Sequence, residues 1–404
     1  MSINKNLCEK YRNNLKSKIG NGNFNKQYKL TTNGDNIYLE LAIANRNPEK
    51  TTERASAQIV RINSLINNPY KYYLSVIRFK IPGYFIPLHV MPVIPNPLDP
   101  TDINYSVYSI TLEYNGESQQ VHLNFISTTG ENANQINPPT INTNGTINQD
   151  QNTAYYYMFE YQQMIDMFNT AFNTAFNRLT NKPLGSESPK LIYNNSQKLF
   201  SLIGQIAYYE INLRDEDRIN VYMNIPAHFL FPAFDVITKS FHGNAPDGKD
   251  IQYIFKNNLN NFWYPPNIAQ TFPALYYEMK QQYRAIGNWL SAKSVIFESI
   301  RLPTRNEFIL SGDNFDPIIT DFELSITADT NIREPLQYNP ASQYRLIDLL
   351  GNTPIYNIDI RLYWVDINGN KKIILIPYNQ LLTIKMIFVK KDLFKNYDPI
   401  EYKE

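Results

Sequence analysis

Residues 358–389 read IDIRLYWVDINGNKKIILIPYNQLLTIKMIFV and carry the strongest fold signal in the chain. The first run alternates apolar and polar side chains, which is typical of a strand with one buried face and one solvent-facing side that would include Asp359. Asn368-Gly369 follows, and both residue types accept the positive φ that a tight hairpin requires. Two further apolar runs complete the stretch. We therefore expect an antiparallel β unit around which the rest of the protein is assembled.

Length and composition favour a β-rich protein with a sizeable core. A chain of 404 residues exceeds what one core usually holds, so two subdomains are expected. The 30 Tyr favour strands and half-buried surfaces, including protein interfaces. The 25 Pro against 15 Gly indicate many rigid loops between short strands.

Charge and cysteine content exclude several classes of protein. The net charge of +1 gives no whole-molecule field that would steer the chain to nucleic acid or membrane. The single cysteine, Cys8, rules out an internal disulfide and suits a reducing compartment. Met1–Ile19 has no apolar leader segment, and no run is long enough for a membrane span. We expect a soluble protein, made inside the cell.

The N-terminal 35 residues form a polar, basic arm. One interpretation is a disordered terminus, because little apolar area is available there. The other is an arm that orders against a neighbouring subunit or lies near packaged DNA. The candidate contact residues are Lys5, Lys10, Arg12, Lys16 and Lys18.

Strand-like runs follow the arm and return near the C-terminus. They alternate apolar and polar residues and are Asn36–Ala44, Tyr72–Ile81, Ser294–Pro303 and Pro317–Thr327. A cluster of prolines from Pro87 to Pro100 cannot be a central strand and predicts a subdomain boundary. Asn115-Gly116 predicts a second hairpin. Residues 127–153, rich in Asn and Thr, are expected to be an exposed loop.

One segment has a clear helical period. In Tyr161–Leu179, Phe168, Phe172 and Phe176 recur every four residues, so the segment predicts an amphipathic helix whose phenylalanines pack in a core. Further along, Ala207–Leu213 is expected to be a short strand, and His242–Gln282 to mix loop with helix.

A search for catalytic or metal-binding groups finds little. The histidines lack metal-ligand spacing, and they are His89, His122, His228 and His242. Cys8 has no partner residues for nucleophilic catalysis. Two acidic groups are candidates for a cation: Asp215-Glu216-Asp217, which more commonly would be a solvated turn, and Asp313 with Asn314 and Asp316. We expect neither enzyme activity nor a cofactor.

Five motifs resemble the C-terminal part of the minor capsid (penton) proteins of virophages and Polinton-like viruses, with the Sputnik group nearest. They are Phe315–Glu323, Gln337–Pro340, Tyr344–Leu349, Tyr363–Asp366 and Lys385–Lys391. Tyr157–Leu179 resembles the middle of the same proteins.

The resemblance implies a mainly β fold: a single jelly-roll β-sandwich with a large inserted upper domain that contains β hairpins and the amphipathic helix. The jelly roll would take residues 36–100 and 289–395, the insertion 101–288, and a charged tail 396–404. It also implies homopentamers that close the five-fold vertices of an icosahedral shell and contact a major capsid protein of double jelly-roll fold. The protein would be made in the host cytoplasm or viral factory and reside at the capsid vertex of the virion.

Two alternatives stay open. Ser75-Val76-Ile77 and Ser294-Val295-Ile296 repeat each other, which is a chance match or the sign of two successive jelly rolls. A β protein that binds glycans or a receptor is the second functional hypothesis. Trp263 and Tyr264 would supply its surface aromatic platform, or Tyr155-Tyr156-Tyr157 would do so.

Overall fold

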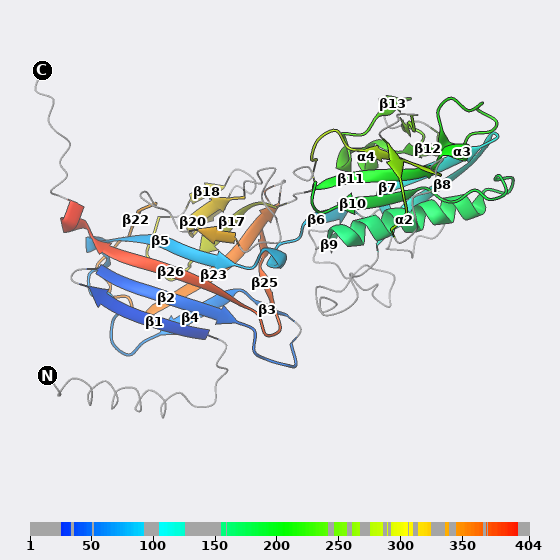
Figure 1. Cartoon of the computed structure of the whole chain (residues 1–404). Helices are drawn as coiled ribbons and strands as arrows, with labels where there is room; N and C mark the ends of the chain where they lie inside the picture. The colour runs from blue at the N-terminus through cyan, green and yellow to red at the C-terminus, as the bar shows by residue number, and fades with distance from the viewer. Residues whose placement is uncertain are drawn as a thin grey trace, which may run out of the picture. The chain divides into compact units, whose positions relative to one another are not determined.

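Strands dominate the computed structural model of the chain (Figure 1). It describes residues 26–33, 36–50, 52–92, 105–125, 155–158, 160–240, 246–256, 261–266, 275–285, 289, 292–305, 307–309, 314–324, 336–338, 345–366, 369 and 371–394. The chain divides into two compact units. Unit 1 is Met1–Phe85, Ser294–Glu323 and Pro335–Glu404, and unit 2 is Ile86–Lys293 and Leu324–Glu334.

The first sheet of unit 1 is antiparallel throughout. Its order is β1 (Lys26–Asn33), β2 (Asn36–Ala44), β26 (Leu381–Lys390), β5 (Tyr72–Ile81) and β21 (Leu336–Tyr338), with β22 (Ile347–Asp348) also on β5. Leu39, Leu41 and Ile43 of β2 are buried, as period-two alternation predicts. The predicted strands at β2 and β5 are confirmed.

The second sheet of unit 1 has the order β20 (Ile318–Glu323), β17 (Ala292–Glu298), β23 (Asn357–Asp366) and β24 (Lys371–Ile373), with β4 (Ser56–Val60) on the first half of β23. The predicted hairpin of β23 and β24 is confirmed: Tyr363 pairs with Ile373, and Gly369 has a φ of 84°. Two short pairs complete the unit. They are β25 (Leu375–Pro377) with β3 (Thr52–Arg54), and β18 (Glu307–Ile309) with β19 (Asn314–Asp316).

The expectation that residues 358–389 form one β unit is wrong in one respect. β23 and β24 lie in the second sheet, whereas β26 is a central strand of the first, between β2 and β5. The chain changes sheets through β25, which pairs with β3 and not with its sequence neighbours. Phe79 of the first sheet packs on Phe297 and Phe322 of the second, with ring centroids 5.4 and 4.6 Å apart. The two sheets therefore share aromatic core contacts.

Unit 2 contains two further antiparallel sheets. One has the order β13 (Val236–Thr238), β14 (Ile251–Tyr253), β12 (Asn220–Met223), β7 (Tyr105–Tyr114) and β8 (Glu117–Asn124). The other has the order β10 (Lys190–Asn194), β11 (Leu199–Gln205), β16 (Tyr276–Lys280) and β15 (Phe262–Trp263). A separate pair joins β6 (His89–Pro92) to β9 (Tyr155–Met158). The predicted β7–β8 hairpin is confirmed, because its Asn115 and Gly116 have φ values of 48° and 76°.

Helix α2 (Tyr161–Arg178) packs on β7, β8 and β10, and its phenylalanine stripe lies in the core of unit 2. Phe168 meets Phe231 edge to face at 5.0 Å, and Trp289 stacks on Phe200 at 4.9 Å. The predicted helix and its packing role are confirmed. Two shorter helices, α3 (Ile206–Tyr209) and α4 (Ile225–Leu230), flank strands of the same unit.

Two local predictions in unit 2 are wrong. Ala207–Leu213 is not a strand: α3 covers its start, Glu210 forms an isolated bridge with Phe255, and the remaining residues are in a turn and a bend. The described parts of 242–282 hold strands and a single 3₁₀ turn, η3 (Pro246–Gly248), and no α-helix. In β16, Tyr277 and Met279 are buried and alternate with Glu278, so the period is that of a strand. Among the described residues, no helix has the length and apolar character needed to cross a membrane.

Candidate assembly surfaces

A buried carboxylate holds the loop that follows β17. Asp359 of β23 accepts hydrogen bonds from the Ser299 hydroxyl and the Arg301 amide, both at 2.8 Å. It was predicted to face solvent, and that prediction is wrong: Asp359 is 6% exposed. The charge is tolerated because several donors converge on it, as buried polar groups require. The loop is thereby fixed at the end of the second sheet, and it presents Ile300 to solvent.

Three loops of unit 1 meet at this end, where β23 begins. The Arg61 amide donates to the Tyr356 carbonyl at 3.0 Å, and the Leu350 amide donates to the Pro303 carbonyl at 2.6 Å. The three segments, 60–71, 299–305 and 345–356, carry exposed apolar side chains that we call the loop-end surface. Its members are Val60, Ile62, Tyr70, Ile300, Leu346, Leu350 and Tyr356. Single exposed apolar residues are ordinary, but a group of seven on adjoining loops indicates a contact surface.

Sequence reasoning did not find the loop-end surface. Ile62 stands between Arg61 and Asn63, and Ile300 between Ser299 and Arg301, so neither belongs to an apolar run. Only the pairing of β4 and β17 with β23 brings the two isoleucines to the same end of the sheet. The two isoleucines could be placed on one surface only with knowledge of which strands pair with β23.

The acidic group around Asp316 is occupied by a lysine. Lys371 of β24 reaches Glu298 at 2.6 Å and also pairs with Asp316. Partial burial lowers the pKa of Lys371, but the hydrogen bonds to Asp316 and Glu298 outweigh it and raise the pKa above its usual value. The ammonium group supplies the positive charge that a metal would otherwise bring. Asp313 and the side chain of Asn314 lie outside the described residues.

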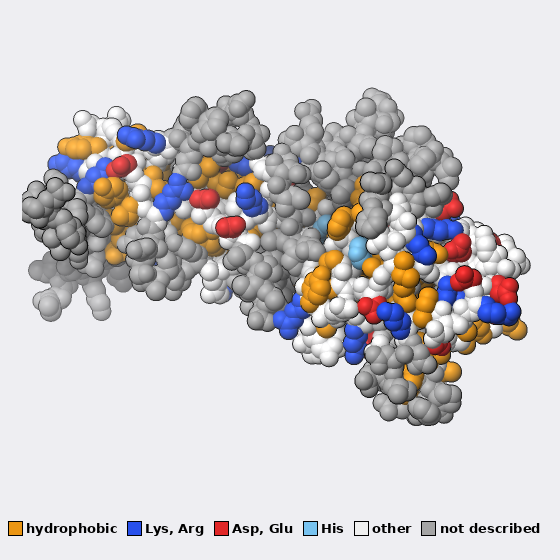
Figure 2. Space-filling view, turned by 90° about the horizontal axis from the view of Figure 1, so that it is seen from above, with side chains coloured by type: hydrophobic (Ala, Val, Ile, Leu, Met, Phe, Trp, Pro, Cys, Tyr) orange, Lys and Arg blue, Asp and Glu red, His pale blue; other side chains and the backbone are white. Residues whose placement is uncertain are grey.

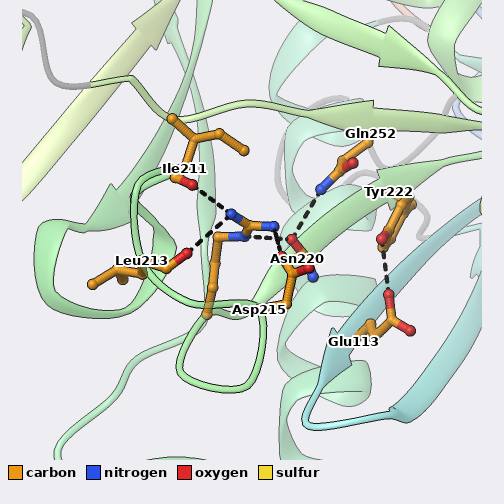
Figure 3. Close-up of polar contacts among 8 residues, drawn as sticks. Glu113, Ile211, Leu213, Asp215, Asn220, Tyr222 and Gln252 are labelled. Carbon is orange, nitrogen blue, oxygen red and sulfur yellow. Dashed lines mark hydrogen bonds and ion pairs between the residues drawn. The ribbon is translucent and has the colours of Figure 1, made fainter.

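Two arginines organise the acidic turn 215–217 of unit 2, and Figure 3 draws Asp215 of this turn close to Ile211, Leu213 and Asn220. Buried Arg218 donates to the Ile211 carbonyl at 2.5 Å and to the Asn220 side chain at 2.7 Å, and it pairs with Asp215. Exposed Arg214 pairs with the other two carboxylates, Glu216 and Asp217. The carboxylates therefore face arginines, as the solvated-turn interpretation predicts. Among the residues that the structure describes, no group of three or more acidic, His or Cys side chains could hold a metal ion.

The candidate aromatic platform lies at a sheet edge of unit 2. Trp263 is in the edge strand β15, and its ring meets Tyr276 edge to face at 5.5 Å. The Tyr276 hydroxyl donates to Glu187 at 3.1 Å. Tyr264 follows the strand, and both Trp263 and Tyr264 are half-buried. Tyr276 was not singled out from the sequence, although it belongs to the aromatic run that β16 contains.

The other predicted groups are dispersed or lie outside the described part. The arm residues Lys5, Lys10, Arg12, Lys16 and Lys18 are outside it, as are His242 and the side chains of Tyr155, Tyr156 and Tyr157. His89 is buried, with Nδ1 3.0 Å from the Trp289 carbonyl and Nε2 2.8 Å from the Tyr108 hydroxyl. Burial lowers its pKa to about 4. Burial also lowers the pKa values of His122 and His228, so each of these histidines is a neutral structural residue.

Charges of both signs are spread over the surface. On the face drawn in Figure 2, hydrophobic side chains stand beside Lys and Arg in the part of the view that belongs to unit 1, and acidic and basic groups intermingle over unit 2. No described group of titratable side chains resembles a catalytic site.

Comparison with protein families gives a match along most of the chain. The model of the family described as Sputnik minor capsid protein V18/19 matches residues 37–390. Structural protein V19 of Sputnik virophage is 33% identical over 211 residues, which cover 50% of this chain and 94% of that protein. Uncharacterized protein V18 of the same virophage is 32% identical over 157 residues, which cover 38% of this chain and 90% of that protein.

Comparison with solved structures also gives matches along most of the chain. A chain of the 3.5 Å cryo-EM structure of Sputnik virophage is 31% identical, with a TM-score of 0.76 over 89% of this chain and 99% of that chain. The crystal structure of the mavirus penton protein is 13% identical, with a TM-score of 0.56 over 88% of this chain and 99% of that chain. At that identity the mavirus likeness concerns the fold alone.

Proposed function

Because the chain belongs to the Sputnik minor capsid protein V18/19 family, we propose that five copies of it close each five-fold vertex of an icosahedral virus shell. As a minor capsid protein it is a structural component of the virion. The observation that carries the proposal is the family match over residues 37–390, because it spans both units of the chain.

In this proposal the lower domain is a single jelly roll. We assign it to residues 36–100 and 289–395, and the inserted upper domain to 101–288. β1 (Lys26–Asn33), which the sequence placed in the basic arm, joins the lower domain because it pairs with β2, whereas β6 (His89–Pro92) goes with the upper domain because it pairs with β9. The support comes from unit 1, where two antiparallel sheets share the contacts of Phe79 with Phe297 and Phe322. The core of a β-sandwich is formed by side chains that pack between the two inner sheet faces, as these three phenylalanines do.

The sides of the ring would be built from sheet edges. β1 and β20 are the outermost strands of their sheets, and an edge strand offers unpaired amide and carbonyl groups to a neighbour. A closed five-fold ring needs two different complementary faces on each subunit. The remaining outer surface would contact a major capsid protein of double jelly-roll fold. The basic arm, with Lys5, Lys10 and Arg12, would reach packaged DNA.

Oligomeric state tests this proposal first. The full chain is purified and its mass measured in solution by light scattering coupled to gel filtration. We expect pentamers, or larger assemblies built from them, at micromolar concentration. A stable monomer over the same concentrations would contradict the proposal.

A second candidate function is glycan binding through unit 2. The observation that favours it is the Trp263 ring held against Tyr276 beside the carboxylate of Glu187, since sugars bind to aromatic faces flanked by polar groups. Glycan-array binding by the full chain, abolished by Trp263→Ala, would support it. Tyr283→Ala, at an exposed tyrosine of the same unit, is the matched control. Equal loss with both variants, or no binding, would count against it.

A further inference from the structure

A small pocket lies in unit 2 beside the strand that carries Trp263. It is lined by residues 254–256, which follow β14, and by residues 277–280 of β16. Asp235 and Asn261 complete the lining. The Asn261 carbonyl accepts a hydrogen bond from the Glu278 amide at 2.7 Å, so the pocket adjoins the point where β15 begins.

The floor of the pocket is apolar and its volume is small. Ile254, Phe255 and Met279 are buried and line it from below the charged groups. The pocket has a volume of about 40 Å³. A water molecule takes about 10–15 Å³ on the same scale, so the pocket holds about three or four heavy atoms. That is too little room for a sugar ring, but it is the size of an acetyl group.

The rim of the pocket carries charges of both signs, and they are already paired. Lys256 pairs with Asp235 at 3.6 Å, and Lys280 pairs with Glu278 at 3.2 Å. A ligand with a net charge would compete with one partner of such a pair. A neutral group that has both a donor and an acceptor meets no such competition, because a carboxylate oxygen still accepts and an ammonium group still donates.

The pocket and the aromatic platform share one strand. Trp263 pairs with Tyr276 of β16, and Glu278 stands two residues further along. Residues two apart in a strand point to the same face, and both Tyr276 and Glu278 are half-buried. A distance of two to four residues along a strand is about 7–14 Å, which is longer than one sugar ring. Adjacent rings of one glycan would therefore reach the platform and the pocket.

We propose that unit 2 binds a glycan that contains a 2-acetamido sugar. One ring lies on Trp263, and the acetamido group of the neighbouring ring enters the pocket. Its methyl group packs on Met279 and the other floor residues, its N–H donates to the Glu278 carboxylate, and its carbonyl accepts from Lys280. An amide that enters an apolar site with its polar atoms satisfied avoids the cost of unpaired burial. This inference rests on the glycan-binding candidate function.

Three disaccharides with the same linkage and ring stereochemistry test the pocket in the full chain. They are N,N′-diacetylchitobiose with acetamido groups, chitobiose with free amines, and cellobiose with hydroxyl groups. The diacetylated sugar should bind about tenfold or more tightly than either of the others, because filling a small apolar pocket discriminates by that amount. In saturation-transfer NMR its acetyl methyl protons should receive the most saturation. Equal affinity for the diacetylated sugar and cellobiose would overturn the proposal.

Two variants and a matched control locate the site. Glu278→Ala should lower the affinity for diacetylchitobiose toward that for cellobiose and leave cellobiose binding unchanged, a split that general damage to the sheet would not produce. Trp263→Ala should weaken the binding of both sugars. Glu216→Ala removes an exposed carboxylate that pairs with Arg214 elsewhere in unit 2, and it should alter neither affinity. If Glu278→Ala weakens both sugars equally, or if Glu216→Ala has the same effect as Glu278→Ala, the assignment of the pocket is wrong.

These measurements separate the pocket from the glycan-binding function itself. If the chain binds glycans through Trp263 but does not prefer acetamido sugars, the pocket proposal fails and the glycan function stands. If the chain binds no glycan, both fail. Preference for the diacetylated sugar that depends on both Trp263 and Glu278 supports both.

Discussion

Acid should destabilise unit 2 through buried His89 and the partly buried His122 and His228, and His89 allows the size of the effect to be worked out. In the folded chain its pKa is about 4, against 6.5 for an unperturbed histidine, and the chief cause is burial. The folded state therefore favours neutral His89, whereas the unfolded state binds a proton below pH 6.5. Stability is complete above that pH and is lost as the pH falls toward 4.

The full difference corresponds to about 3 kcal/mol at 1.36 kcal/mol for each pH unit, of which about 2 kcal/mol is already lost at pH 5. His122 and His228 act in the same direction, because burial lowers the pKa of each. Carboxylates such as Glu113, whose pKa is held below its usual 4.5 by Lys249 and Tyr222 despite partial burial, contribute only at lower pH. Between pH 6.5 and 5 the histidines therefore dominate.

Urea unfolding at a series of pH values measures this effect. Trp364→Phe confines tryptophan fluorescence to Trp263 and Trp289, both in unit 2. The free energy of unfolding should fall by about 2 kcal/mol or more between pH 7 and pH 5. His89→Gln, which cannot titrate, should remove most of that dependence. A free energy that is unchanged at pH 5, or a pH dependence that persists fully in His89→Gln, would refute the reasoning.

Three further substitutions test individual features of the fold by thermal or urea unfolding. Asp359→Ala leaves the Ser299 hydroxyl and the Arg301 amide without their acceptor and should cost about 1–3 kcal/mol; a neutral result would mean that the loop is not anchored there. Phe172→Ala opens a cavity in the core of unit 2 and should lower the free energy of unfolding by about 3–5 kcal/mol. A loss well below this range would mean that Phe172 is not packed in the core. Gly116→Ala meets no atom within 4 Å but keeps a φ of +76°, so strain alone should cost about 1–2 kcal/mol. A stabilised Gly116→Ala would contradict the assigned turn.

Local signals in the sequence predicted local structure well. The Asn115-Gly116 pair sits in the expected hairpin, and Phe168 and Phe172 lie on the buried side of the expected helix. Both features depend on turn chemistry or periodicity within a few residues, which the sequence contains directly.

Long-range arrangement was harder to predict. β24 and β26 are near neighbours in the sequence but belong to different sheets, because β26 pairs with β2 and β5 from the other end of the chain. Asp359 has the alternation of a solvent-facing residue and is buried, because its partners come from another strand's loop. The loop-end surface likewise depends on strand pairing. Such features arise from contacts that no sequence window contains.

The resemblance to virophage minor capsid proteins is confirmed by the family match and by the Sputnik structure. The functions predicted for the candidate sites stay predictions. Trp263 and Tyr264 have described positions but no tested ligand, and the contacts of the basic arm stay a prediction.

Electron cryo-microscopy of the assembled particle is the most direct test of the central claim. The account predicts density for five copies of this chain around every five-fold axis, with strands of unit 1 facing the neighbouring copies. Vertices built from another protein, or this chain found elsewhere in the shell, would contradict it.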